Sequence, residues 1–264
     1  MKQPVMQHTP AGFPGVDLHT HILPQMDDGS ASVQESLRML QQLQQQGVGA
    51  LALSSHYYPY REQLTTYIQR RQAAWQKLRT ALYAGAPRLA LSAEVFFCDT
   101  LLAQDDVSDI CTTGADGQLY LLTELPEGRP VSDNTLHKLL QFMDEQGIIP
   151  VLAHLERYPD LFHNAGKLKQ LTQAGIRVQL STTAIPATFW ESRRIKRYIS
   201  QGLIHGLGSD AHNMGVRAPR YAAGYEQLCQ MLGQAQAEDL NRQAWQMISG
   251  RWLQPADKLT CATP

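Results

Sequence analysis

The stretch SDNTLHKLLQFMDEQGIIPVLAHL, residues 132–155, contains one complete repeating unit of the fold. Apolar residues recur at helical spacing over 132–146, and Gly147 is a typical residue at the end of a helix. The run IIPVLAHL over 148–155 is short and almost wholly apolar, which predicts a buried strand. A helix followed at once by a buried strand is the unit from which parallel α/β folds are built.

The same alternation extends along the chain in both directions. About seven βα units predict a parallel sheet with right-handed crossovers. With this many units and no break in composition, a closed or nearly closed barrel is favoured over two domains, and a doubly wound open sheet is the alternative. We expect one domain over 1–264, with a short N-terminal extension over about 1–14 and a C-terminal tail over about 254–264. The other expected strands are 15–18, 48–55, 88–97, 118–126, 176–182 and 203–210; the other expected helices are 30–46, 61–83, 160–174, 186–201 and a helical region from about 219 to 250.

Composition excludes several classes of protein. The net charge of −1 and the pI near 6.7 predict no general attraction to nucleic acid or to an anionic membrane. The sequence has neither a signal peptide nor an apolar run long enough to span a membrane, so we expect a cytoplasmic protein. The four cysteines form no CxxC pair, which argues against a zinc knuckle. None begins a Cys-x5-Arg motif, which argues against a thiol-based phosphatase.

Ligand-type side chains lie at the ends of almost every expected strand. In a parallel barrel these ends gather on one face, which is the face that carries active sites. One such histidine is more often a packed or hydrogen-bonded residue than a ligand, but independent core residues would not cluster at one edge of successive strands. The residues, in chain order, are His19, His21, His56, Glu94, Glu124, His154, Asp210 and His212.

The spacing of these residues indicates a metal centre. His19 and His21 are separated by one residue at a strand end, so both imidazoles point to the same side. Imidazole and carboxylate ligands without sulfur favour Mn, Fe or Zn in a reactive rather than structural role. About eight ligands exceed the needs of one ion; Glu94 could bridge two ions, and Asp28 and Glu124 leave room for a third.

Two arginines follow these ligands in the sequence. Arg157 lies three residues past His154, and Arg217 lies five past His212. Guanidinium groups match phosphate oxygens bidentately, although either arginine alone is as often an ordinary surface residue. Together with a metal cluster they predict phosphate-ester hydrolysis through attack of a metal-activated hydroxide on phosphorus.

Six segments, DLHTHILPQMDDG, LSSHYYP, SAEVFF, LLTELPEG, VLAHLERY and GSDAHN, resemble the PHP (polymerase and histidinol phosphatase) superfamily in order and spacing. The resemblance is closest to its capsule-type, CpsB-like protein tyrosine phosphatases and covers about residues 16–220. It implies a distorted (β/α)7 TIM-like barrel with three metal ions, usually Mn2+, and catalytic roles for Arg157, Arg217 and Asp28. The metal ligands that it implies are His19, His21, Asp28, His56, Glu94, Glu124, His154, Asp210 and His212.

The resemblance also implies a substrate, the phosphotyrosine-bearing tail of a bacterial tyrosine autokinase that controls capsule or exopolysaccharide synthesis. A small-molecule phosphatase of the histidinol phosphate type is an alternative on the same fold. A non-catalytic regulatory or interaction subunit is another, but it predicts lost ligands, and all nine implied ligands are present. The oligomeric state and the general acid for the leaving group stay open.

The sequence departs from the family pattern in two segments. It has Ser55-His56-Tyr57 where the family often has Pro-His-His, and Leu155 replaces a proline after His154. We expect these changes to affect the rim of the pocket, where Tyr57, Tyr58 and Tyr60 would stack on an aromatic ring, unless they only pack on a loop. Asp17 is expected to orient a ligand histidine, and Asp27 has no assigned role.

Overall fold

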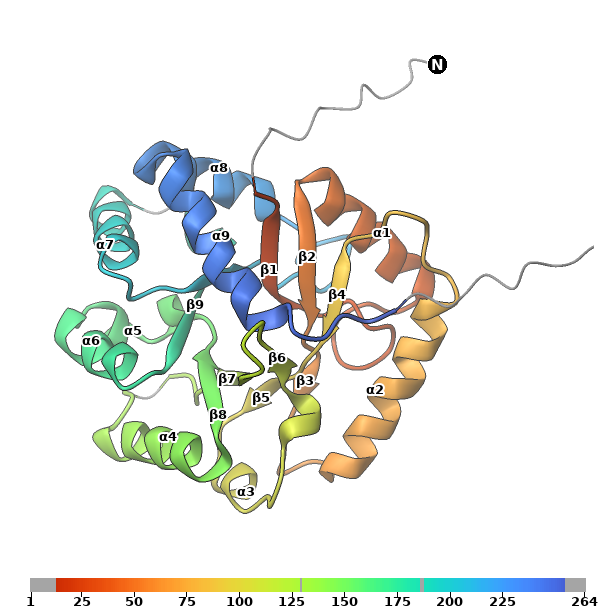
Figure 1. Cartoon of the computed structure of the whole chain (residues 1–264), viewed down its shortest axis with the longest axis horizontal. Coiled ribbons are helices and arrows are strands. Elements are labelled where there is room, and N and C mark those ends of the chain that lie inside the picture. The colour runs from red at the N-terminus through yellow and green to blue at the C-terminus, as the bar shows by residue number, and fades with distance from the viewer. Residues whose placement is uncertain (1–12, 129, 186–187, 255–264) are drawn as a thin grey trace, which may run out of the picture.

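The computed structural model describes residues 13–254, except residues 129, 186 and 187. Most of the expected N-terminal extension and of the C-terminal tail therefore lies outside the described residues. Figure 1 shows a curled sheet with helices arranged around its outside. No helix in the described part of the chain is both long and apolar enough to cross a membrane.

Seven parallel strand positions form a ring, as expected for a distorted (β/α)7 barrel. The pairing order is β3-β5-β7-β8-β9-β10-β1-β2-β4. Strand β3 continues β2 after a short break, and β5 continues β4 in the same way. The two ends of the pairing order, β3 and β4, therefore belong to adjacent strand positions, and the sheet closes on itself. The strands are β1 (Gly15–Thr20), β2 (Val48–Leu53), β3 (His56–Tyr57), β4 (Arg88–Leu91), β5 (Glu94–Phe96), β7 (Leu119–Glu124), β8 (Ile148–Leu152), β9 (Arg177–Ser181) and β10 (Gly206–Gly208).

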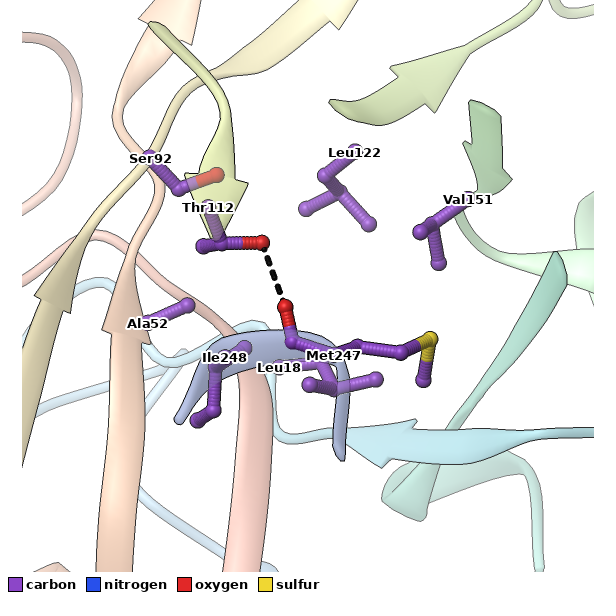
Figure 2. A pocket seen from close by; sticks show the side chains of 8 residues that line it. All are labelled: Leu18, Ala52, Ser92, Thr112, Leu122, Val151, Met247 and Ile248. Atoms are coloured by element: carbon purple, nitrogen blue, oxygen red, sulfur yellow. Dashed lines mark hydrogen bonds between the residues drawn. The ribbon is translucent and has the colours of Figure 1, made fainter. Parts of the chain in front are cut away.

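The distortion lies between β4 and β7, in the half of the barrel where the strands begin. There β4 pairs only with β2, and β7 pairs with the short antiparallel strand β6 (Thr112–Thr113). Helix α9 (Gln234–Ile248) packs Ala244, Met247 and Ile248 against the apolar side chains that line the inside of this half. Thr112 Oγ1 donates a hydrogen bond to the carbonyl of Met247 (2.9 Å), as Figure 2 shows, and the cavity left there is only about 10 Å³. The barrel is therefore sealed at this end.

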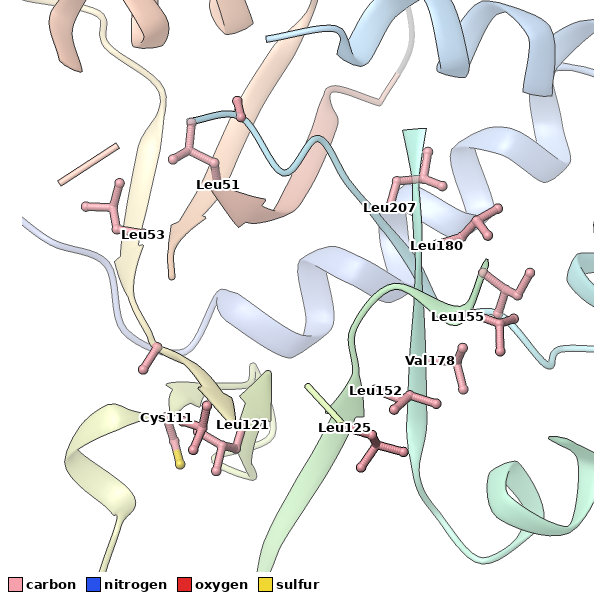
Figure 3. Close-up of a cluster of buried hydrophobic side chains, with 14 of the residues drawn as sticks. Leu51, Leu53, Cys111, Leu121, Leu125, Leu152, Leu155, Val178, Leu180 and Leu207 are labelled. Carbon is pink, nitrogen blue, oxygen red and sulfur yellow. The ribbon is translucent and has the colours of Figure 1, made fainter. Parts of the chain in front are cut away.

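The outer face of the sheet packs on the surrounding helices. Leu51, Leu121, Leu152 and Leu207 are fully or almost fully buried in this outer core, part of which Figure 3 shows. The outer helices are α1 (Val33–Gln45), α2 (Leu64–Arg79), α4 (Asp133–Gln146), α6 (Ala165–Gln173), α7 (Phe189–Ser200) and α8 (Tyr221–Leu232), with the short helices α3 (Asp99–Leu102) and α5 (Pro159–Phe162) between them; single 3-10 turns are Ser108–Ile110, Leu155–Arg157 and Thr182–Ala184.

Helix α4 and strand β8 form the unit predicted over 132–155. The Ser132 side chain accepts a hydrogen bond from the backbone N–H of Thr135 and begins the helix. Gly147 ends it with φ 65°, in the left-handed region that favours glycine. The capped helix then leads directly into the buried strand.

Two expected helices are each divided in the structure. The helical region over 219–250 is interrupted at Gly233, whose φ of 86° is incompatible with a continuous helix. The helix over 160–174 is interrupted because the Asn164 side chain accepts a hydrogen bond from the backbone N–H of Lys167 and starts a new helix. Two expected strands, 48–55 and 88–97, are interrupted at 54–55 and 92–93, and both breaks lie beside the site described next.

Candidate metal centre

The structure brings all nine implied ligands together at the ends of the barrel strands. Their ligand atoms fall into four overlapping groups, and within each group the atoms lie within 4.8 Å of one another. Such overlap is expected of neighbouring ions that share ligands rather than of one isolated ion. The groups are His21–Asp28–His56–His212, His19–His21–Asp210, His19–Glu94–His154 and His56–Glu94–Glu124.

Glu94 lies at the centre of the cluster and is almost fully buried. Its Oε2 atom lies 3.0 Å from Nε2 of His19, 3.2 Å from Nε2 of His21 and 2.9 Å from Nδ1 of His56. Its Oε1 atom lies 3.2 Å from Nε2 of His154. One carboxylate therefore faces four imidazoles, which is the arrangement expected of a bridging ligand.

The breaks in two strands place Glu94 and His56. Both were expected at strand ends, but each is instead the first residue after a break, in β5 and β3. The backbone N–H of Glu94 donates to the carbonyl of Ser54 inside the neighbouring break (3.0 Å). The paired breaks thus bend both strands at the same level, and the bend brings the two side chains to the cluster.

Asp210 connects the metal cluster to the two arginines. Its Oδ1 lies 3.5 Å from Nε2 of both His19 and His21. Its Oδ2 accepts hydrogen bonds from Arg157 (3.1 Å) and from Arg217 (2.6 Å). Asp210 and His154 both have positive φ, 53° and 52°, a region in which non-glycine residues are strained and which is common at functional sites.

Asp28 lies at the open edge of the cluster, and its side chain is 64% exposed. Its Oδ1 is 3.4 Å from Nε2 of His212 and 3.6 Å from Nε2 of His56. Its Oδ2 accepts a hydrogen bond from Arg217 (3.2 Å). Arg217 therefore connects Asp28 to Asp210 across the mouth of the site.

The donor set fits metal ions. Both Glu94 carboxylate oxygens, Asp210 Oδ1, His56 Nδ1 and His212 Nε2 are buried and have no hydrogen-bond partner among the described residues. These groups approach one another at ion-pair distances but without hydrogen bonds, which is costly for buried polar atoms, and cations shared between them would remove that cost. Nitrogen and oxygen ligands without sulfur suit Mn, Fe or Zn.

The two arginines are partly exposed and face the cluster. The side chains of Arg157 and Arg217 are 36% and 37% exposed. Arg157 also pairs with Glu127 (2.7 Å) and, more distantly, with Glu124 (3.5 Å). Burial raises the pKa of Glu124 to about 7, an effect to which the charge of Glu94 adds. Because both arginines face the cluster, an anion that entered it would meet two guanidinium groups.

Asp27, which had no assigned role, orients the ligands. Its Oδ2 lies 2.7 Å from Nδ1 of His21 and accepts a hydrogen bond from the backbone N–H of His56 (2.7 Å). Its Oδ1 accepts from the N–H of Gly29 (3.0 Å). Burial would raise the pKa of Asp27, but the imidazole of His21 outweighs burial and holds this pKa well below its usual range. The only signal in the sequence was its place between His21 and Asp28 in one loop.

Asp17 is buried and contacts a ligand histidine, but through the backbone of that residue and not its ring. It accepts hydrogen bonds from the backbone N–H groups of His19 (3.2 Å) and Ser209 (2.8 Å), and so joins two segments that carry ligands. Burial raises its pKa to about 7. It therefore positions the backbone beneath the cluster rather than an imidazole.

The strand without a predicted ligand, β9, provides orienting groups instead. Gln179 Oε1 accepts the N–H of His154 (3.0 Å) and lies 3.5 Å from Nδ1 of His19. Ser181 Oγ lies 2.9 Å from Nδ1 of His154. Fixing the outer ring nitrogen sets which nitrogen faces a metal. Sequence reasoning missed both residues because neither is a ligand type.

The expectation that Tyr57 and Leu155 shape the rim is wrong. Both are fully buried in the outer core. Tyr57 follows His56 in β3, so their side chains point to opposite faces, and the Tyr57 ring lies 4.8 Å from that of Tyr67. Tyr58 does reach the site, where its ring stacks on His56 at 5.2 Å.

Comparison with known proteins finds relatives over most of the chain. Tyrosine-protein phosphatase CpsB of Streptococcus pneumoniae is 26% identical over 238 residues, which cover 85% of this chain and 94% of CpsB. Putative tyrosine-protein phosphatase CapC of Staphylococcus aureus is 28% identical over 212 residues, covering 76% and 78%. A solved structure from work on YwqE of Bacillus subtilis and CpsB of S. pneumoniae, described as unique metal-dependent tyrosine phosphatases, matches 91% of this chain and 98% of its own with a TM-score of 0.67. At 21% identity this last match supports the fold.

The family described as "Capsular polysaccharide synthesis, CpsB/CapC" matches residues 15–248. That range contains every strand of the barrel, all nine clustered ligands and both arginines. The chain belongs to the CpsB/CapC family.

Proposed function

We propose that this protein is a metal-dependent phosphatase that hydrolyses phosphotyrosine in proteins. The observation that carries the proposal is the convergence of Arg157 and Arg217 on Asp210, whose other oxygen faces His19 and His21. A site with metal ligands on one side and two guanidinium groups on the other suits a phosphate ester. The relatives named as tyrosine-protein phosphatases support the choice of phosphotyrosine.

We assign the nine clustered residues as ligands of three ions, with Mn2+ the expected metal and Fe or Zn as alternatives. The four overlapping ligand groups support more than one ion. When bound, such ions activate water for attack on phosphorus and neutralise the charge that develops on the phosphate. The buried carboxylate of Glu94 faces the most imidazoles and is the proposed bridging ligand.

The remaining steps belong to residues of this chain. Arg157 and Arg217 are placed to hold the phosphate oxygens that do not take part in bond cleavage. To do so, each guanidinium exchanges a contact with a protein carboxylate, Glu127 or Asp28, for a contact with substrate. A phenolate is a stable leaving group and needs little protonation as it departs. Asp28, at the open edge, completes the proposed catalytic set.

The proposed partner is the phosphotyrosine-bearing tail of a bacterial tyrosine autokinase that controls capsule or exopolysaccharide synthesis. The family description, which refers to capsular polysaccharide synthesis, supports this assignment. We infer a cytoplasmic location, which suits the three described cysteines, Cys98, Cys111 and Cys229, because all are free thiols.

One experiment tests the proposal against the small-molecule alternative. The purified protein is stripped of metal with a chelator, restored separately with Mn2+, Fe2+ or Zn2+, and assayed on a phosphotyrosyl peptide and on histidinol phosphate. We expect activity to disappear and return with metal, and kcat/KM to be higher on the peptide. Higher kcat/KM on histidinol phosphate would support the alternative, and activity unaffected by metal removal would refute a metal-dependent mechanism.

A further inference from the structure

A groove opens from the metal cluster toward the start of α2. It has a volume of about 340 Å³, and its lining includes Asp28, His56, Tyr58, Arg61 and Glu62. Because Asp28 and His56 also belong to one of the candidate metal groups, the groove and the cluster share a wall. A substrate whose phosphate lies at the cluster can therefore extend its next atoms into this groove.

One side of the groove is formed by the rings of His56 and Tyr58. The Tyr58 ring stacks on His56 with centroids 5.2 Å apart and planes 29° apart. Behind it, Tyr60 meets Phe96 edge-on at 5.6 Å. Tyr58 is half-buried. The Tyr58 ring thus forms a wall of the groove next to the candidate phosphate site.

Among the charged side chains that line the groove, Arg61 is the one that has no ion-pair partner in the described part of the chain. Asp27 is engaged with His21, Asp28 with Arg217, and Glu62 with Arg70 at 2.6 Å. Arg61 is exposed and makes no ion pair with any carboxylate in the part of the chain that the structure describes. Its guanidinium instead lies over Tyr58 (4.5 Å) and Tyr60 (5.5 Å).

Stacking holds the Arg61 guanidinium without using its hydrogen-bonding capacity. A guanidinium on an aromatic face keeps its N–H donors free at its edges. Those donors match the paired oxygens of a carboxylate or a phosphate. Arg61 is thus fixed in position beside the groove and still able to bind an anion.

We propose that Tyr58 and Arg61 form a specificity subsite. In it an anionic group on a substrate residue next to the phosphotyrosine binds Arg61, and the Tyr58 ring holds the guanidinium in place. The anion is a carboxylate or a second phosphate. The subsite rests on the proposed phosphotyrosine phosphatase function and adds that the preferred substrate segment is acidic or multiply phosphorylated.

The test compares three phosphotyrosyl peptides that differ only in the residues flanking the phosphotyrosine: alanine, glutamate or phosphoserine. The metal-loaded protein, Arg61→Ala and Arg61→Lys are assayed on each peptide. Arg193→Ala is the matched control, because Arg193 is also exposed and stacked on an aromatic ring, Phe189 at 5.7 Å, but lies on α7.

We expect the unmodified protein to prefer the anionic peptides by about 3- to 10-fold in kcat/KM, mainly through KM, because one charge-assisted contact is added. Arg61→Ala should bring this ratio close to one, Arg61→Lys should retain part of it, and Arg193→Ala should leave it unchanged. High salt should reduce the ratio in the unmodified protein. Whether glutamate or phosphoserine gives the larger ratio identifies the anion.

The outcomes separate the subsite from the function on which it rests. If the unmodified protein hydrolyses all three peptides without preference, or if Arg61→Ala keeps the preference, the subsite is refuted and the phosphatase function stands. If the metal-loaded protein hydrolyses none of the peptides, the proposed function falls and the subsite falls with it. A second pair tests the stacking that holds Arg61: Tyr58→Phe should keep the preference for the anionic peptides, and Tyr58→Leu should reduce it.

Discussion

Replacing Asp27 by asparagine tests whether a residue outside the candidate ligand groups sets the metal affinity of the cluster. In the structure its carboxylate faces Nδ1 of His21 and accepts the N–H groups of His56 and Gly29. Asp27→Asn keeps the size of the side chain but removes its charge, and its amide nitrogen cannot accept a hydrogen bond. At least one of the three contacts is therefore lost.

The size of the effect follows from these contacts. Loss of an orienting partner of a ligand histidine typically weakens metal binding about 10- to 100-fold, which corresponds to about 1.4 to 2.7 kcal/mol of binding free energy. A buried donor left unpaired adds about 1 to 3 kcal/mol to the cost of folding. We therefore expect weaker metal binding together with a modest loss of stability, and activity that recovers at saturating metal.

Equilibrium dialysis against graded free Mn2+, followed by elemental analysis, measures the affinity, and urea unfolding measures the stability. Asp116→Asn is the matched control, since Asp116 also accepts a backbone N–H, that of Gln118 (3.0 Å), in an exposed turn. If Asp27→Asn binds metal as tightly as the control variant does, the orienting role is wrong.

Three further predictions follow from the site and the core. Arg157→Ala is expected to lower turnover of p-nitrophenyl phosphate by about 100-fold or more with metal content intact; near-normal turnover would contradict its role. His19→Ala should lose metal along with activity, and unchanged metal stoichiometry by elemental analysis would rule out its assignment as a ligand. Burial and the nearby Arg177 lower the pKa of His205 from 6.5 to about 4. Protonation of His205 is therefore less favourable in the folded than in the unfolded protein. This difference contributes about 3 kcal/mol to the free energy of unfolding above pH 6.5 and is lost as the pH falls toward 4. In His205→Asn the amide oxygen can still accept the N–H of Val178, so urea unfolding should show a flatter pH dependence; equal slopes in both proteins would refute this account.

The sequence predicted the barrel and the gathering of ligand-type residues because both follow from local rules. Hydrophobic periodicity locates strands and helices, and parallel connection places the strand ends on one face. His19, Glu124 and His154 could therefore be placed at that face without coordinates. Whether they bind metal is a chemical question that the experiments above address.

The parts that could not be predicted depend on contacts between distant segments. Gln179 meets His154 and His19 only because β8, β9 and β1 lie close together in the closed barrel. The break before His56 turns Tyr57 into the core, and no local pattern in LSSHYYP marks that break. The sequence predicted a helical region from about 219 to 250 but not that its second helix, α9, closes the barrel interior.

The position of α9 has a consequence for how the chain folds during synthesis. The first strand, β1, lies between β10 and β2, and the backbone N–H of Val16 donates to the side chain of Asn241 in α9 (3.3 Å). The interior of the barrel therefore stays exposed until α9 has left the ribosome, and its closure depends on contacts of long sequence separation. Shortening the chain within α9 would leave the apolar interior open to water and to aggregation rather than remove a dispensable terminus.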